Sequence, residues 1–556
     1  MRNWIPLIGQ LQDYDLRQDM KSDLNAALIV AIMLIPQGMA YAMLAGLPPV
    51  MGLYASTVPI VIYALLGSSR QLAVGPVAMV SLLVYTGVSG IAEPGSEEYI
   101  AYVLLLALMV GAIQLLLGLL RLGAVTKYIS HAVISGFTSA AAIIIAFSQM
   151  DSLLGTDLGE SKNVFIIMIE AVQNIGNIQA ETFFIGLASI IVLFLMKKYT
   201  PKIPGPLTVV VLSIAAVQLF NLEQTGVEVV GEIPGGLPGL TIPAMSADAV
   251  LTLLPIAVTI SLIGFVESYA MAKVIATRER YAVHPDQELR ALGAANIGTG
   301  FFSGFPVTGG FSRSAVNYDS GAKTGLAGMM TAVFVILTLL FFTSWFYYLP
   351  QAVLAAIIIV AVYGLIDVKE PKHLWQVKRA DAVTLAVTFI ATLAVGIEAG
   401  IITGVGFSLT VFLYRSGKPH MAELGYLESE GVYRNIKRFP QAKTDDDKLI
   451  IRIDAPIYFA NMAYIEEQLR HYMLEHPRLT HVIFDFSSVN DIDAVAVDEL
   501  EKWLDHHGSR GIRFYFVTVH GPVRDIFKRA GWDEKFAGSL YYRDINEAHK
   551  AASSYS

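Results

Sequence analysis

The chain has 556 residues, of which 54% are hydrophobic and only 15% are charged, and its formal net charge is −8. Because a soluble domain averages about 25% charged residues, much of this surface faces something other than water. The sequence has no cysteine, which excludes disulfides, thiolate chemistry and cysteine-based zinc sites, and it has no basic tract that indicates a nucleic-acid partner.

The composition changes along the chain and divides it into four parts. Residues 1–23 are polar, and the apolar run from Leu24 lacks the short apolar region and cleavage site of a signal peptide. Residues 24–415 are mainly apolar runs, whereas the remainder has a soluble composition. We therefore predict a cytosolic N-terminal segment (1–23), a transmembrane domain (24–415), a linker with a first strand (416–447) and a soluble domain (448–556).

A helix crosses the hydrocarbon core with about 20 apolar residues. The sequence offers fourteen candidate spans: 24–43, 49–66, 74–87, 100–120, 128–149, 180–197, 206–221, 250–274, 286–299, 311–318, 325–345, 351–367, 380–396 and 398–414. Segments 74–87 and 311–318 are too short to cross alone, and 286–299 is weakly apolar. Segment 163–175 has helical periodicity but lies between spans, so we expect an interfacial helix there.

The distribution of Lys and Arg predicts the orientation of these spans. On one side, every loop carries basic residues. On the other side, the only one is Lys162, across segments 45–49, 88–99, 150–179, 222–248, 346–350 and the turn near Glu398. This asymmetry favours an even number of spans with both termini in the cytosol, in a multi-pass protein of the cell (inner) membrane. The alternative is a large soluble protein with buried helices.

The two short segments share one pattern, an extended stretch rich in Gly and Pro before a short helix, at 73–79 and 303–314. Proline disfavours helix in the residue before it and suits the first helical turn. Gly75 and Gly309 lie 234 positions apart, a spacing close to the 230 positions between Gln37 and Glu267. We infer two related halves of seven spans, and an odd number per half forces an inverted repeat. Paired broken helices of this kind mark the binding site of many transporters.

The physics of helix ends predicts the charge of the ligand. A helix N-terminus has unpaired N–H groups and about half a positive charge. Two half-helices that start at one point would make an anion site without any lysine. The alternative is that these glycines and prolines only produce kinks and close packing.

Polar residues inside spans face the interior of the bundle and mark function. Glu267 lies in the eighth segment, and Arg313 begins the second half-helix. We predict Glu267 as a proton carrier, with a structural Glu–Arg pair as the alternative. Gln37 and Tyr41 lie one turn apart on the first span. They offer an amide and a phenol on one face, although Gln37 would equally suit an interhelical hydrogen bond.

These motifs resemble the SulP family of anion transporters, from residue 19 to about 542. The similarity is carried by the segments 34–42 (LIPQGMAYA), 67–71 (GSSRQ), 74–76 (VGP) and 310–317 (GFSRSAVN). The resemblance implies a seven-plus-seven inverted repeat with core and gate domains, a homodimer, and an elevator-like movement of the core. It also implies an anion held between the two half-helix N-termini.

The resemblance further implies which residues bind the anion. The family's binding positions correspond here to Gln37, Tyr41, Val77, Ala78, Phe311, Ser312 and Arg313. Among them, the Ser312 N–H would donate a hydrogen bond and Arg313 would add positive field. Glu267 matches an acidic position that is associated with cation coupling in several members.

The C-terminal part predicts an α/β layer fold, because strands alternate with helices. Strands are expected at 448–454, 481–486 and 513–517, and a second helix at about 493–506. A first helix carries an amphipathic stripe of Met462, Ile465, Leu469 and Met473. This part resembles a STAS domain, as in anti-sigma-factor antagonists. Their phosphorylatable serine follows an aspartate, but here Ala494 follows Asp493, which excludes a phospho-switch at that position.

The sequence therefore favours a secondary active transporter of small inorganic anions. We expect sulfate as the substrate, coupled to protons or to anion exchange. Bicarbonate, chloride and dicarboxylates remain open as substrates, and a membrane-anchored anion sensor that signals through the STAS domain is the alternative from another class. Arg313 and the STAS domain argue against a nucleobase permease, since a neutral base needs no such positive field. We expect no enzyme, no metal and no cofactor, because neither a catalytic constellation nor a Walker phosphate loop is present. The expected partners are the anion, membrane lipid, a second copy of the chain and a cytosolic protein at the STAS domain.

Overall fold

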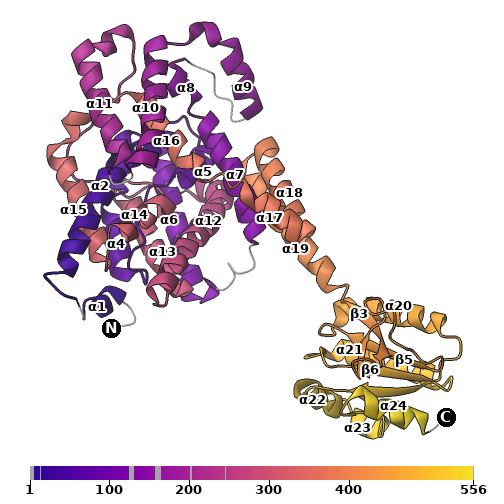
Figure 1. The fold of residues 1–556 in the computed structure, drawn as a ribbon. Helices are drawn as coiled ribbons and strands as arrows, with labels where there is room; N and C mark the ends of the chain where they lie inside the picture. The colour runs from indigo at the N-terminus through magenta and orange to yellow at the C-terminus, as the bar shows by residue number, and fades with distance from the viewer. Residues whose placement is uncertain are drawn as a thin grey trace. The chain divides into compact units, whose positions relative to one another are not determined.

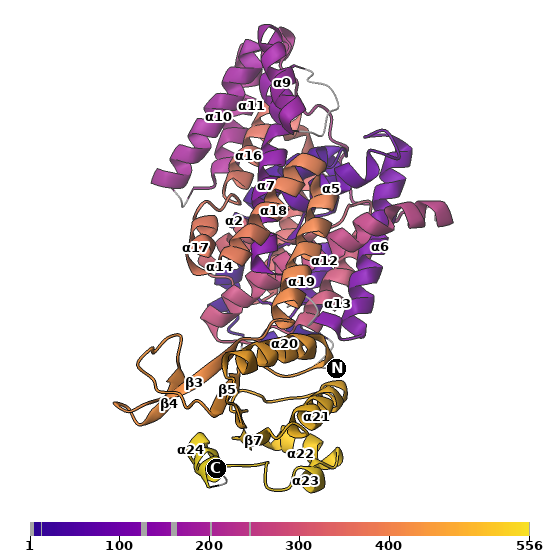
Figure 2. The same cartoon turned by 90° about the vertical axis from the view of Figure 1, so that its right-hand side faces the viewer.

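The chain folds into two compact units, Met1–Ser408 and Leu409–Ser556. A computed structural model describes residues 5–12, 14–123, 130–156, 164–200, 203–243 and 246–554. The first unit is built of helices and the second contains a sheet covered by helices (Figures 1 and 2).

The first half of the helical unit runs to Phe220. Its elements are α1 (Pro6–Gln10), α2 (Asp19–Leu44), α3 (Pro49–Tyr54), α4 (Val58–Leu66), β1 (Val74–Gly75), α5 (Ala78–Val88), α6 (Glu97–Leu119), α7 (His131–Phe147), α8 (Met150–Leu154), α9 (Val164–Gln173), α10 (Ala180–Tyr199) and α11 (Gly205–Phe220). The prediction of a helix between spans at 163–175 is confirmed by α9.

The second half repeats this order. Its elements are α12 (Ala247–Glu279), α13 (Pro285–Phe301), β2 (Thr308–Gly309), α14 (Phe311–Asp319), α15 (Leu326–Phe341), α16 (Gln351–Tyr363), α17 (Lys369–Val377), α18 (Arg379–Val395) and α19 (Ile397–Ser416). The weakly apolar segment 286–299 is helical, and its polar side chains Glu288, Asn296 and Thr299 are fully buried inside the unit rather than exposed to lipid.

Each of the fourteen predicted spans contains a helix within the described ranges. Seven helical segments there are long and apolar enough to cross a membrane by themselves: Asp19–Leu44, Pro49–Leu66, Glu97–Leu119, His131–Leu154, Ala180–Tyr199, Ala247–Glu279 and Ala399–Ser416. The others are shorter or interrupted, as α5 and α14 are. The count of fourteen crossings therefore stays a prediction.

The two halves pack together in the same pattern. In the first set of contacts α2 packs on α15, and α6 packs on α12. In the second set α7 packs on α18, and α10 packs on α16. Each pair joins one helix from each half. Within each set the two contacts are equivalent, because the helices of one pair occupy the same positions in the repeat as the helices of the other pair. The helical unit is thus an interlocked pair of similar halves rather than two consecutive bundles.

Buried carboxylates fasten the halves at two further points. Glu288 of α13 accepts hydrogen bonds at 2.7 Å from the Tyr63 hydroxyl and from both the N–H and hydroxyl of Ser68. Asp23 of α2 accepts from the Thr324 hydroxyl at 2.7 Å. A buried charge is stable only when it is paired or fully hydrogen-bonded. These bonds therefore hold together the segments of the two halves that they join.

The second unit contains a five-stranded sheet in the order β4-β3-β5-β6-β7. Its strands are β3 (Met421–Leu427), β4 (Val432–Asn435), β5 (Lys448–Ile453), β6 (His481–Asp485) and β7 (Arg513–Val517). Its helices are α20 (Phe459–Glu475), α21 (Ala494–Gly508), α22 (Gly521–Arg529), α23 (Trp532–Lys535) and α24 (Ile545–Ser553). The predicted strands and both predicted helices are confirmed.

Apolar side chains cover both faces of this sheet. One face packs Phe484 and Phe516 against Leu469 and Trp532, and the other packs Ile483 against α24. Asp493 is the N-cap of α21 and accepts the Ala496 N–H at 2.8 Å. Asp493, which precedes Ala494, therefore stabilises the N-terminus of α21.

Close helix packing generates a first prediction. A Cβ built at Gly52 of α3 would lie only 1.9 Å from the Gly38 carbonyl oxygen of α2. Gly52→Ala must separate these helices, and overpacking of this kind costs about 1–3 kcal/mol. We expect a lower thermal unfolding temperature in detergent. Gly90→Ala is the matched control, since no atom lies within 4 Å of its built Cβ. Equal effects of both changes would contradict this assignment.

Candidate functional site

The two Gly/Pro stretches pair with each other through their backbones. Val74 of β1 is opposite Gly309 of β2, and Gly75 is opposite Thr308, in antiparallel register. The Gly310 N–H donates to the Ala73 carbonyl at 3.0 Å. Because α5 begins at Ala78 and α14 at Phe311, this pairing brings the starts of both half-helices together. The predicted sequence of an extended stretch and then a short helix is confirmed in both halves.

Neither half-helix has a side-chain cap. The N-cap residues are Val77 for α5 and Gly310 for α14, and neither side chain accepts a hydrogen bond from the first turn. Ser96 caps α6 and Ser246 caps α12, whereas other helices of the unit, such as α4 and α16, also have no side-chain cap. Uncapped first-turn N–H groups carry the positive end of the helix dipole. Both half-helices therefore begin with N–H groups that no N-cap side chain engages.

Helix α12 holds β2 in place through its Ser268 side chain. The Ser268 hydroxyl accepts the Gly309 N–H at 2.7 Å and contacts the Thr308 hydroxyl at 2.5 Å. The Thr308 hydroxyl donates to the Gly264 carbonyl at 2.5 Å. A Cβ at Gly264 would lie 3.1 Å from the Thr308 hydroxyl oxygen, so glycine permits this approach. Glu267 is adjacent to Ser268 on α12.

Two more polar side chains hold the extended stretches. The Asn296 amide donates to the Val307 carbonyl at 3.0 Å and accepts the Val307 N–H at 2.7 Å. The Ser314 hydroxyl accepts the Ala73 N–H at 2.9 Å. These positioning residues are not among those predicted from the sequence. The only available signal was their polarity within apolar surroundings, and that signal does not identify a partner.

Arg313 and Glu267 are both buried at this point, with exposed fractions of 3% and 7%. A Cβ built at Gly310 would lie 3.0 Å from Arg313 Nη2, and one at Gly75 would lie 3.4 Å from the same nitrogen. The guanidinium therefore lies against both extended stretches. Gly75 also has a φ of 153°, a backbone conformation that residues with a side chain rarely adopt.

Several polar atoms of this pair have no partner. Arg313 Nε and Nη2 and Glu267 Oε2 are buried without a hydrogen bond in the described part of the chain. No ion pair within 4 Å joins the two residues among the described salt bridges, although their charges interact electrostatically with each other and with Tyr41. Buried guanidinium N–H groups need acceptors, and an anion at the half-helix starts would supply them.

The structure brings most of the predicted site residues to one region. Tyr41 is 6% exposed, and Gln37 lies one turn before it on α2 at 5%. Ala78 is buried at the start of α5, with Val77 half-buried before it, whereas Phe311 and Ser312 are exposed at the start of α14. The binding role of each residue stays a prediction. Within the described ranges no cluster of three or more His, Asp or Glu side chains could hold a metal ion.

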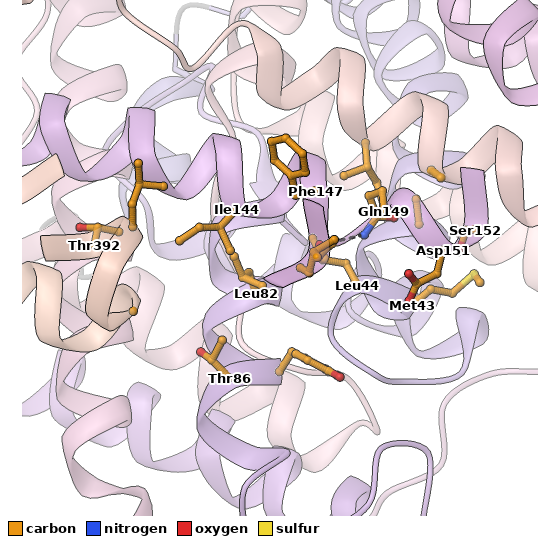
Figure 3. A pocket seen from close by; sticks show the side chains of 18 of the residues that line it. Met43, Leu44, Leu82, Thr86, Ile144, Phe147, Gln149, Asp151, Ser152 and Thr392 are labelled. Carbon is orange, nitrogen blue, oxygen red and sulfur yellow. Dashed lines mark hydrogen bonds between the residues drawn. The ribbon is translucent and has the colours of Figure 1, made fainter. Parts of the chain in front are cut away.

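A cavity of about 660 Å³ lies elsewhere, and none of the predicted site residues lines it. It is an open cleft lined by residues of α2, α5, α7, α8, α9, α16, α18 and α19. Figure 3 shows Gln149, Asp151 and Ser152 at one end of it, with Leu82 and Ile144 farther along. Gln149 donates from its amide to Ser148 Oγ at 3.2 Å. Helices α2 and α5 line this cavity and also carry predicted site residues. The cavity therefore borders helices that position the candidate site.

Residues 20–388 match the Sulfate permease family, and residues 439–548 match the STAS domain. The chain belongs to the sulfate permease family. It is 40% identical to "Sulfate transporter 4.1, chloroplastic" of Arabidopsis thaliana, over 100% of this chain and 84% of that protein.

Two solved structures share the fold. The murine Solute Carrier 26 family member A9 anion transporter, in its inward-facing state, aligns with a TM-score of 0.92 at 25% identity, covering 99% of this chain and 94% of that one. The transmembrane domain of the cyanobacterial bicarbonate transporter BicA aligns with a TM-score of 0.61 at 23% identity, covering 70% of this chain and 98% of that one. The chain is thus a multi-pass membrane protein with a C-terminal STAS domain.

The contacts of Ser268 generate a second prediction. Ser268→Ala removes the acceptor of the Gly309 N–H, and a buried donor without its partner costs about 1–3 kcal/mol. We expect the Gly309 amide to exchange hydrogen about tenfold faster or more, measured by mass spectrometry. Ser261→Ala is the control, because Ser261 donates to the Val110 and Ala257 carbonyls and does not touch β2. Unchanged exchange at Gly309 would mean that Ser268 does not hold the strand.

Proposed function

We propose that this protein is a secondary active transporter of small inorganic anions and that sulfate is its substrate. One observation carries the proposal: two uncapped half-helices begin beside a buried, unpartnered guanidinium. Helix N-termini and arginine together favour an anion with several oxygens, since each N–H needs its own acceptor. The names of relatives such as the Arabidopsis sulfate transporter support this choice.

In this proposal the first turns of α5 and α14 bind the anion from two directions. The backbone N–H groups at Ala78 and Ser312 donate to its oxygens, and Val77 and Phe311 shape the two entrances. Arg313 supplies a full positive charge from beside Gly75 and Gly310. Gln37 and Tyr41 contribute an amide and a hydroxyl from α2. Bicarbonate, chloride and dicarboxylates meet the same charge requirement and are the alternatives that an uptake panel must test.

We further propose an elevator-like movement of the anion site. The cavity of 660 Å³ supports it, because unfilled space lies between the site-bearing helices α2 and α5 and the helices α7, α16 and α18. A rigid core that slides along α7, α16 and α18 would use this space and would carry the bound anion with it.

We propose that the protein is a homodimer in a cell (inner) membrane with both termini in the cytosol. The basic residues gather on the loops of the same side as the STAS domain, as the positive-inside rule requires of a cytosolic face. The STAS domain then either stabilises the dimer or binds a cytosolic protein. We propose no phosphorylation switch at the start of α21, because the first residue of that helix is Ala494.

Glu267 is the proposed proton carrier, because it is buried, lacks a hydrogen bond and interacts electrostatically with Arg313. Glu267→Gln keeps the shape of the side chain but removes its charge. We expect it to abolish sulfate accumulation driven by a pH gradient in proteoliposomes, with anion exchange retained. Glu279→Gln is the control, since Glu279 is on the same helix and accepts from the Tyr318 hydroxyl. Accumulation equal to that of the wild type would refute proton coupling through Glu267.

Arg313 is the proposed source of preference for divalent anions. A doubled ligand charge doubles the Coulomb interaction with a guanidinium. We therefore expect Arg313→Ala to weaken sulfate binding about tenfold or more and chloride binding by a smaller factor, each measured by competition of labelled uptake. Arg313→Lys keeps the charge and should retain part of the preference. Equal losses for both anions would mean that Arg313 serves packing rather than charge selection.

A further inference from the structure

Helix α17 joins α16 to α18 and is amphipathic. Val368, Pro371 and Trp375 recur at helical spacing, and Lys369 and Lys372 lie beside them on the neighbouring surface. The helix has nine residues, and none of them is buried. Figure 2 shows it at the edge of the helical unit.

Helix α17 packs on α18, but this contact leaves several apolar side chains uncovered. Yet Val368 is 78% exposed, Val377 is 67% exposed and Trp375 is 57% exposed. Tryptophan on such a face is typical of the interface between headgroups and acyl chains. A lipid surface would cover these side chains and account for the helix.

The charges around α17 indicate which lipid this is. Between Lys369 and Arg379 the sequence has four basic residues and one acidic residue, Glu370. Glu370 faces His131 Nε2 at 3.8 Å. The carboxylate of Asp367 accepts the Lys369 and Glu370 N–H groups at 2.9 and 3.0 Å, at the start of α17.

The nearby acidic groups are thus engaged elsewhere. Lys369, Lys372 and Lys378 form no ion pair among the described salt bridges, and Arg379 lies over the Trp375 ring at 5.9 Å. Lys197 at the end of α10 adds a further charge, with its Nζ 4.0 Å from a Cβ built at Gly364. Basic residues around an exposed aromatic face are complementary to anionic headgroups.

Contacts link α17 to helices that border the cavity. The Asp367 N–H donates to Ser139 Oγ of α7 at 3.2 Å. Helix α18 begins directly after α17, and its residues Thr392 to Val395 line the cavity. A surface that holds α17 would therefore also restrain α7 and α18.

We propose that α17 docks on anionic phospholipids of the cytosolic leaflet. Val368 and Trp375 enter the boundary between headgroups and acyl chains, while Lys369, Lys372 and Lys378 bind headgroup phosphates. The docking anchors α7 and α18 and gives transport a dependence on anionic lipid. The inference uses the proposed membrane orientation but not the identity of the transported anion.

The absence of cysteine from the sequence permits a direct test. Val368→Cys in the full-length protein is labelled with bimane and placed in liposomes that contain brominated phosphatidylglycerol or brominated phosphatidylcholine. We expect stronger quenching by phosphatidylglycerol at equal mole fraction. Each basic residue near an anionic surface strengthens binding about fivefold. The combined changes Lys369→Gln, Lys372→Gln and Lys378→Gln should therefore reduce that preference about tenfold or more.

Controls separate lipid docking from the alternatives. A label at Ser509→Cys, on the exposed surface of the second unit, should show no lipid preference. Lys502→Gln, Lys528→Gln and Lys550→Gln remove the same charge from that unit and should leave quenching at Val368 unchanged. Equal quenching by both lipids, or no quenching by either, would overturn the proposal. Cross-linking of Val368→Cys to a second copy or to the STAS domain would overturn it as well. None of these readouts requires transport, so their failure is distinct from failure of the proposed function.

Discussion

The helical unit depends on one short piece of backbone pairing. Strands β1 and β2 have two residues each, yet their antiparallel register fixes where both half-helices begin. In a membrane interior every backbone N–H and C=O needs a partner, and extended chain is tolerated only where the protein supplies one. The pairing does this, and Ser268, Asn296 and Ser314 complete it from three different helices. Without it the two helix starts would not converge on Arg313.

This arrangement places positive potential in a low-dielectric interior with few ionised side chains. Aligned peptide dipoles provide it at two helix starts, and a single guanidinium adds a full charge. Other buried charges in the helical unit have structural partners, such as Glu288 with Tyr63 and Ser68, or Asp23 with Thr324. The buried charged residues thus fall into two groups. Glu288 and Asp23 are hydrogen-bonded and stabilise the fold, whereas Arg313 and Glu267 have buried polar atoms without a partner in the described part of the chain.

Local patterns explain what the sequence could predict. The lengths of apolar runs indicated the helices, and Gly/Pro stretches indicated both half-helices. Alternating strands and helices indicated the α/β domain, and the basic loops indicated an orientation. The register of β1 on β2 has no local signal, because it joins Val74 to Gly309 and Gly75 to Thr308, residues 235 and 233 positions apart along the chain. Likewise, Asn296 looks like any polar residue in a helix until Val307 is beside it, and the cavity depends on side-chain packing among helices that are distant in sequence.

The separation of β1 from β2 along the chain has a consequence for biosynthesis. When Val74 and Gly75 leave the ribosome, the strand that satisfies their backbone does not yet exist. Their N–H and C=O groups must remain hydrated or be shielded by the insertion machinery until residue 309 arrives. A nascent chain that stops before α14 therefore contains membrane-length helices around an unsatisfied polar break. Such a product is recognisably incomplete, so the same pairing that builds the site also reports that both halves have been inserted.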